Sequence, residues 1–87
     1  MQEMKYVVTE SENGEKHLFV FPKCFDHDAF SEVLSYIRVY EGREWEREFR
    51  KPVSAGFTDG AECYGSSETL DLASRKEDTA LLLQGGV

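Results

Sequence analysis

The sequence has few of the features that carry chemistry or membrane insertion. Its longest apolar runs, at residues 18–21 and 81–83, are far shorter than the roughly 18–20 residues that span a bilayer. The first residues lack the basic, apolar and small-residue regions of a secretory signal. We therefore expect no membrane partner and a cytoplasmic location, in a bacterial or a host cell.

Cysteines and ligand pairs are scarce. The two cysteines, Cys24 and Cys63, are far apart, and cytosolic thiols stay reduced, so no disulfide is expected. A structural zinc site normally shows two close ligand pairs, whereas only Cys24 and His27 form one here. The glycines at 56, 60 and 65 do not fit a phosphate-binding motif. We expect no metal and no cofactor.

Basic residues are outnumbered, with 10 Lys and Arg against 17 Asp and Glu and a net charge of −7. Nonspecific attraction to nucleic acid or anionic lipid requires a surplus of positive charge, so direct nucleic-acid binding is not expected. The acidity leaves a second class of function open. In that alternative, carboxylates occupy phosphate positions in a partner's basic groove, and the protein is a nucleic-acid-mimicking inhibitor.

The residues that are present predict a single α+β domain over residues 1–87. Residues 4–9 and 17–21 are rich in β-branched and aromatic side chains, and Asn13-Gly14 between them predicts a hairpin with a type I′ turn. Residues 53–57 and 62–64 flank Asp59-Gly60, which predicts a second hairpin of the same kind. Two hairpins then build an antiparallel sheet.

Two helices accompany this sheet. After Asp26 and Asp28, either of which can cap a helix, apolar residues recur at spacings of three and four: Ala29, Phe30, Val33, Leu34 and Ile37. This pattern predicts a main helix over residues 28–40 that ends near Gly42 and packs on one face of the sheet. Ser74 and Glu77 fit a capping box before a short C-terminal helix. The expected order is ββ-α-ββ-α.

The segment 42–52 has the most unusual composition, with charges and aromatic residues alternating around Trp45. A helix would set like charges beside one another, so an extended or irregular segment is favoured. A strand would place four residues of the types enriched at interface hot spots on one face: Arg43, Trp45, Arg47 and Phe49. These are the candidate protein-binding residues. The competing interpretation is that Trp45 and Phe49 complete the core.

Catalysis is the weakest alternative. Cys24 and His27 suggest a small enzyme with a thiol nucleophile, but adjacency in sequence is not the criterion for a catalytic dyad. An ordinary buried cysteine is favoured, and we expect the chain not to be an enzyme. The primary expectation is a non-catalytic protein-binding module, whose partner is another protein or a further copy of the chain.

Three segments of the second half and one of the first carry a resemblance: VSAGF at 53–57, CYGSSETLDL at 63–72, SRKED at 74–78 and FVFP at 19–22. With these segments as its markers, about half of the chain resembles small uncharacterised proteins encoded by phages and bacterial genomes. The segments contain no catalytic motif. The resemblance implies a phage or prophage accessory protein that occludes a host protein, such as a CRISPR or other defence component.

Overall fold

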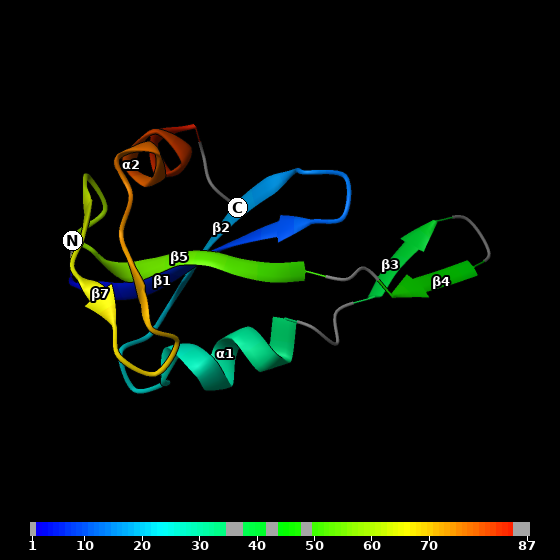
Figure 1. Ribbon diagram of the computed structural model, residues 1–87, viewed down its shortest axis with the longest axis horizontal. Coiled ribbons are helices and arrows are strands. Elements are labelled where there is room, and N and C mark those ends of the chain that lie inside the picture. Colours follow the sequence, from blue (N-terminus) through cyan, green and yellow to red (C-terminus); the bar gives the residue numbers. More distant parts are fainter. Residues whose placement is uncertain (1, 35–37, 42–43, 48–49, 85–87) are drawn as a thin grey trace.

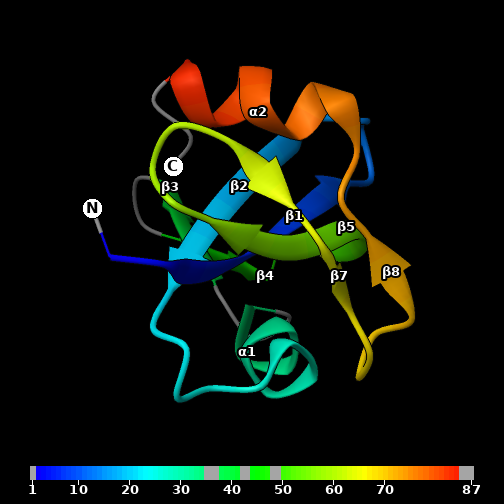
Figure 2. The ribbon, with the colours of Figure 1, turned by 90° about the vertical axis from the view of Figure 1, so that its left-hand side faces the viewer.

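The structure, a computed structural model, describes residues 2–34, 38–41, 44–47 and 50–84, with the main chain alone for 38–41, 44–47 and Arg50. It is an α+β fold in which an antiparallel sheet lies between two helices, as Figure 1 and Figure 2 show. In chain order the elements are β1 (Met4–Ser11), β2 (Lys16–Phe21), α1 (His27–Leu34), β3 (Arg38–Glu41), β4 (Glu44–Arg47), β5 (Arg50–Thr58), β6 (Cys63–Tyr64), β7 (Ser66–Ser67), β8 (Leu72–Ala73) and α2 (Lys76–Leu83).

The main sheet has the strand order β2-β1-β5-β6, and β3-β4 and β7-β8 form two separate pairs. The α+β class and the antiparallel sheet are confirmed. The simple ββ-α-ββ-α order is not, because six of the strands that the structure describes follow α1 in the chain, where the sequence predicted two. Neither helix in the described part of the chain is long and apolar enough to cross a membrane.

Strand β1 lies at the centre of the fold, paired with β2 on one side and β5 on the other. Successive side chains of a strand point to opposite faces, so Val7 joins the core under α1 while Tyr6 and Val8 join the core under α2. Burial on both faces explains the uninterrupted buried run over residues 6–9. The sequence predicted a helix on one face, and the structure adds α2 on the other.

Both predicted hairpins are confirmed, but neither turn is type I′. In the second, Asp59 lacks the positive φ that this turn requires, and residues 59–62 separate β5 from β6. Gly14 has a positive φ of 87°, whereas Asn13 does not, and the Gly14 N–H donates to the Ser11 carbonyl at 3.0 Å. This is a type I turn followed by a left-handed glycine. Asn13 stabilises the turn instead through its Oδ1 atom, which accepts from the Glu15 N–H at 3.2 Å.

The predicted main helix over 28–40 is wrong at residues 38–40. Helix α1 runs from His27 to Leu34, and residues 38–41 form strand β3. Phe30 and Leu34 pack on the sheet as predicted, but Val33 is 61% exposed. Val39 and Tyr40 are residues of high β propensity, and pairing with β4 overrides the helical spacing. Ile37 and Gly42 lie outside the described residues.

Candidate functional site

The β3–β4 hairpin lies beyond the end of the main sheet and extends away from both helices (Figure 1). Its strands pair antiparallel with each other, and neither pairs with another strand that the structure describes. Each of the two strands is therefore an edge strand. A strand edge presents a row of unpaired N–H and C=O groups, which is a template for pairing with a further chain.

The hairpin contains two of the four predicted binding residues. Trp45 and Arg47 belong to β4, so the prediction of an extended segment is confirmed for residues 44–47. In the register of the hairpin, Tyr40 lies opposite Trp45 and Arg38 lies opposite Arg47. Arg43 and Phe49 lie outside the described residues. Strand β3 was missed by the sequence analysis, although the aromatic and β-branched pair at 39–40 was a usable signal.

The cross-strand pairs of the hairpin are unfavourable at both of its ends. Arg38 lies opposite Arg47, and Glu41 lies opposite Glu44. Like charges placed directly opposite each other destabilise a strand pair, and an isolated two-stranded hairpin is marginal in water. The two end pairs therefore weaken the pairing of β3 with β4.

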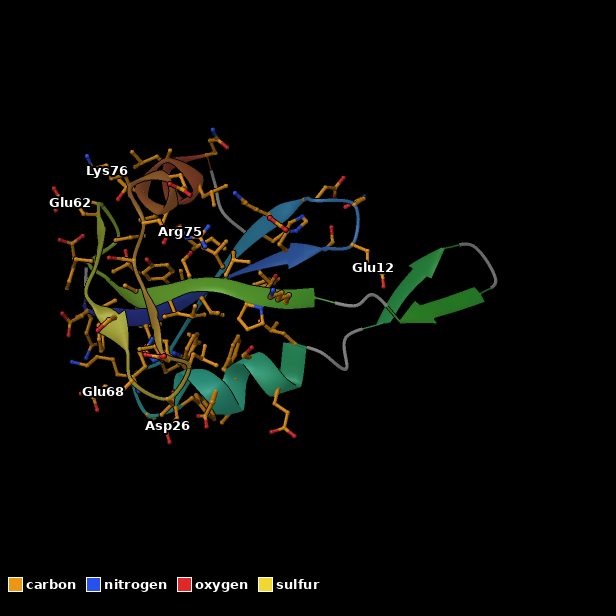
Figure 3. All side chains as sticks on the ribbon, in the orientation of Figure 1. Glu12, Asp26, Glu62, Glu68, Arg75 and Lys76 are labelled. Atoms are coloured by element: carbon orange, nitrogen blue, oxygen red, sulfur yellow. The ribbon has the colours of Figure 1, made fainter. Side chains whose placement is uncertain are left out.

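We call the main sheet with its two helices the body of the protein. A hollow of about 490 Å³ lies at the end of the body away from the β3–β4 hairpin, where α1 begins. Asp26 and Glu68 are at this end in Figure 3. Both line the hollow, with Lys5, His27, Phe57, Gly65, Ser66 and Thr69. The Lys5 ammonium donates to the Phe25 carbonyl at 2.8 Å and lies 3.8 Å from the Asp26 carboxylate. The one cation of the lining is thus already engaged by the protein.

His27, a residue of the Cys24–His27 alternative, is buried at the rim of this hollow. Its Nε2 atom lies 2.8 Å from the Gly56 carbonyl oxygen, which can only accept, so Nε2 carries a hydrogen and donates it. The ring packs edge to face against Phe21 and Phe57, with centroids 5.6 and 5.7 Å away. Nε2 is therefore occupied in joining α1 to β5. Cys24 is exposed on the preceding loop, so the expectation of a buried cysteine is wrong for this residue.

A buried carboxylate connects the main sheet to α2. Asp78 is 1% exposed and accepts three hydrogen bonds: from the Tyr6 hydroxyl at 2.6 Å, the Ser54 hydroxyl at 2.9 Å and the Arg75 N–H at 2.9 Å. The last bond caps α2. The predicted capping box of Ser74 and Glu77 is therefore wrong. Arg75 is the N-cap, and only the second half of such a box forms, in which the Asp78 carboxylate accepts from the Arg75 N–H while it also reaches the sheet.

The Asp78 carboxylate contributes to raised pKa values at two neighbouring groups, Tyr6 and Cys63. Burial, and then the hydrogen bond to Asp78, raise the pKa of the Tyr6 hydroxyl far above its usual value. Burial, and then the charge of Asp78, raise the pKa of the Cys63 thiol. Both groups stay in their neutral forms at neutral pH. Asp78 is buried from solvent, so this cluster serves to hold α2 to the main sheet.

Within the described residues, no group of three or more His, Cys, Asp and Glu is placed to hold a metal ion. Cys24 and Cys63 are both free thiols. No protein-family model, curated protein or solved structure matches this chain.

Proposed function

We propose that this chain is a non-catalytic protein-binding module that contacts its partner through the β3–β4 hairpin. The observation that carries the proposal is the position of that hairpin, beyond the sheet and with one edge of each strand left unpaired by the other strands that the structure describes. Edge strands bind other proteins by strand addition, in which main-chain hydrogen bonds give affinity and side chains give specificity. Trp45 and Arg47 on β4 are of the types that dominate interface energies.

The body of the protein supports the non-catalytic part of the proposal. Asp78, its most buried carboxylate, is saturated by hydrogen bonds from within the fold. His27 is bonded to a main-chain carbonyl rather than to a hydroxyl or thiol. A catalytic base needs to reach the proton that it abstracts, and these two side chains are engaged in holding elements together.

The resemblance to phage-encoded proteins suggests where a partner would be found. A cytoplasmic host protein, such as a component of a CRISPR or other defence system, would be occluded by an added strand. The net charge of −7 favours a partner with a basic surface over nucleic acid or a membrane.

A capture experiment with four forms of the tagged protein tests the proposal. The wild type is compared with a variant in which Gly and Ser replace Arg38–Arg47 at equal length, and with Trp45→Ala. Phe25→Ala is the matched control, because it removes a 51% exposed aromatic side chain from the body. Bound proteins are identified by mass spectrometry from nuclease-treated host lysate, at low and moderate salt.

We expect a stoichiometric partner that the wild type and Phe25→Ala capture, that Trp45→Ala captures weakly and that the Gly-Ser variant loses. The Gly-Ser variant should keep its fold, since β3 and β4 pair only with each other among the described strands. Equal capture by the Gly-Ser variant would contradict the proposal. If that capture also fell steeply with salt, the acidic body would be the binding surface, as nucleic-acid mimicry requires.

A further inference from the structure

We infer that the hairpin binds a second copy of this chain, with strand β3 of one copy pairing antiparallel to strand β3 of the other. The inference rests on the proposed function, because it takes the hairpin as the binding element and names its partner. Two features of the hairpin carry it: the unpaired edge of β3 and the distribution of charge along the two strands.

The charges of the hairpin are separated by sign between its two ends. Both arginines, Arg38 and Arg47, stand opposite each other at one end, and both glutamates, Glu41 and Glu44, at the other. An antiparallel neighbour is reversed end for end, so its glutamate end meets the arginine end of the first copy. The hairpin is thus complementary in charge to itself, and a twofold axis relates the two copies.

The β3–β3 register follows from this reversal. Arg38 lies opposite Glu41 of the second copy, and Glu41 lies opposite Arg38 of the second copy. Between these two pairs, Val39 lies opposite Tyr40 of the second copy, and the symmetry repeats that contact. Opposite charges and aromatic with β-branched residues are both favourable cross-strand pairs. All four positions of the strand are then matched.

The edge of β4 is a poorer site for the same partner. Antiparallel β4–β4 pairing would also set Glu44 opposite Arg47 of the second copy, but it would set Trp45 opposite Glu46. The β3 edge replaces those two mismatches with apolar pairs. It also places the arginine pair of each hairpin next to the glutamate pair of the other, which offsets the like-charge repulsion within each hairpin.

Reversing one charge at a time tests this pairing without harming the hairpin. Arg38→Glu places a carboxylate opposite Arg47 within the chain, and Glu41→Arg places a guanidinium opposite Glu44. Each variant therefore removes a like-charged pair from its own hairpin and should fold at least as well as the wild type. In a homodimer, however, each sets like charges opposite each other twice. The matched controls reverse exposed charges on α2: Lys76→Glu and Glu77→Arg.

Sedimentation equilibrium gives the dissociation constants. Two four-residue strands form an interface below the standard size of about 1,200–2,000 Å², so a micromolar or weaker dimer is expected. Each β3 variant alone should weaken self-association at least about tenfold. An equimolar mixture of Arg38→Glu and Glu41→Arg chains should restore it as a heterodimer within about threefold of the wild type, because every pair is again opposite in charge. The α2 variants should dimerise like the wild type.

A wild type that stays monomeric up to about 1 mM, variants that self-associate as well as the wild type, or a mixture that does not associate would each overturn the inference. A monomer that captures another protein only with its hairpin intact would reject the second copy and leave the proposed function standing. A monomer whose capture does not depend on the hairpin would reject both.

Discussion

The hydroxyl of Tyr6 donates to the carboxylate of Asp78 at 2.6 Å, across 72 residues of sequence. Tyr6 is on the central strand and Asp78 is in the first turn of α2. The same carboxylate accepts from Ser54 on β5. One buried side chain thus connects both central strands to the last helix, and hydrogen bonds in such a dry environment are strong when all of them are made.

Replacing this carboxylate should destabilise the fold. Asp78→Ala leaves the Tyr6 and Ser54 hydroxyls and the Arg75 N–H without their acceptor. Leaving buried donors unsatisfied costs about 1–3 kcal/mol for each group, so we expect a loss of about 3 kcal/mol or more in the free energy of unfolding, measured by urea denaturation. Glu77→Ala, at a neighbouring exposed position, should change stability by less than about 0.5 kcal/mol. Equal losses would contradict the role of Asp78.

The exposed pair of Tyr64 and Glu3 makes a prediction about pH. The Tyr64 hydroxyl donates to Glu3 at 2.5 Å, and this bond raises the pKa of Tyr64 from 10.0 to about 12. A raised pKa means that the stabilising contribution of the bond is present below pH 10 and is lost as the pH rises through about 12.

A tyrosine-ring ¹³C NMR titration measures this directly. In Glu3→Gln, the pKa of Tyr64 should fall toward its ordinary value, because the negative acceptor is gone. Glu62→Gln neutralises an exposed carboxylate next to β6 that makes no hydrogen bond to Tyr64 in the structure, so it should leave the Tyr64 pKa high. A Tyr64 pKa that is the same in the wild type and Glu3→Gln would show that the bond does not form.

The two cysteines should differ in reactivity. Cys24 is exposed, whereas Cys63 is partly buried, and burial with the nearby Asp78 charge raises its pKa. Since the thiolate is the nucleophile, iodoacetamide at pH 8 should modify Cys24 at least about tenfold faster than Cys63, as followed by peptide mass spectrometry. Denaturant should bring the two rates together. Similar rates in the folded protein would contradict the described environment of Cys63.

Gly56 should not tolerate a side chain. A Cβ atom at this position would collide with the main-chain oxygen of Tyr64 and lie 3.3 Å from the Tyr6 ring. Gly56→Ala should therefore destabilise the fold by about 1–3 kcal/mol in thermal or urea unfolding, as overpacked sites do. At Gly14 the space is open but φ is +87°, so Gly14→Ala should cost only about 1 kcal/mol. The reverse ranking would contradict the close approach of β5 and β6.

The parts of the fold that were predicted from the sequence depend on local signals. Asn13-Gly14 and Asp59-Gly60 marked both hairpins, since turn residues act within a few positions of themselves. Helix α1 was extended too far because Ile37 continues the spacing of Phe30 and Leu34, and only the pairing of β3 with β4 overrides it. The spacing of apolar residues along the sequence does not show which segments pair as strands in the fold.

The buried Asp78 cluster was also beyond sequence reasoning. Serine at 74 and glutamate at 77 fit the capping-box pattern, whereas Arg75 and Asp78 do not. What decides between them is that Asp78 reaches Tyr6 and Ser54 on strands distant in sequence. Of the candidate binding residues, Trp45 and Arg47 were placed in an extended segment correctly, and their role stays a prediction.

Amide hydrogen exchange of the protein with and without its bound partner tests the central claim most directly. The experiment compares dilute protein with concentrated protein and with the complex captured from lysate. Our account predicts that exchange slows in Arg38–Glu41 and Glu44–Arg47 on binding, while the main sheet and both helices keep their rates. Slowing confined to β2, α1 or the hollow at Lys5 and His27, with the hairpin unchanged, would contradict it.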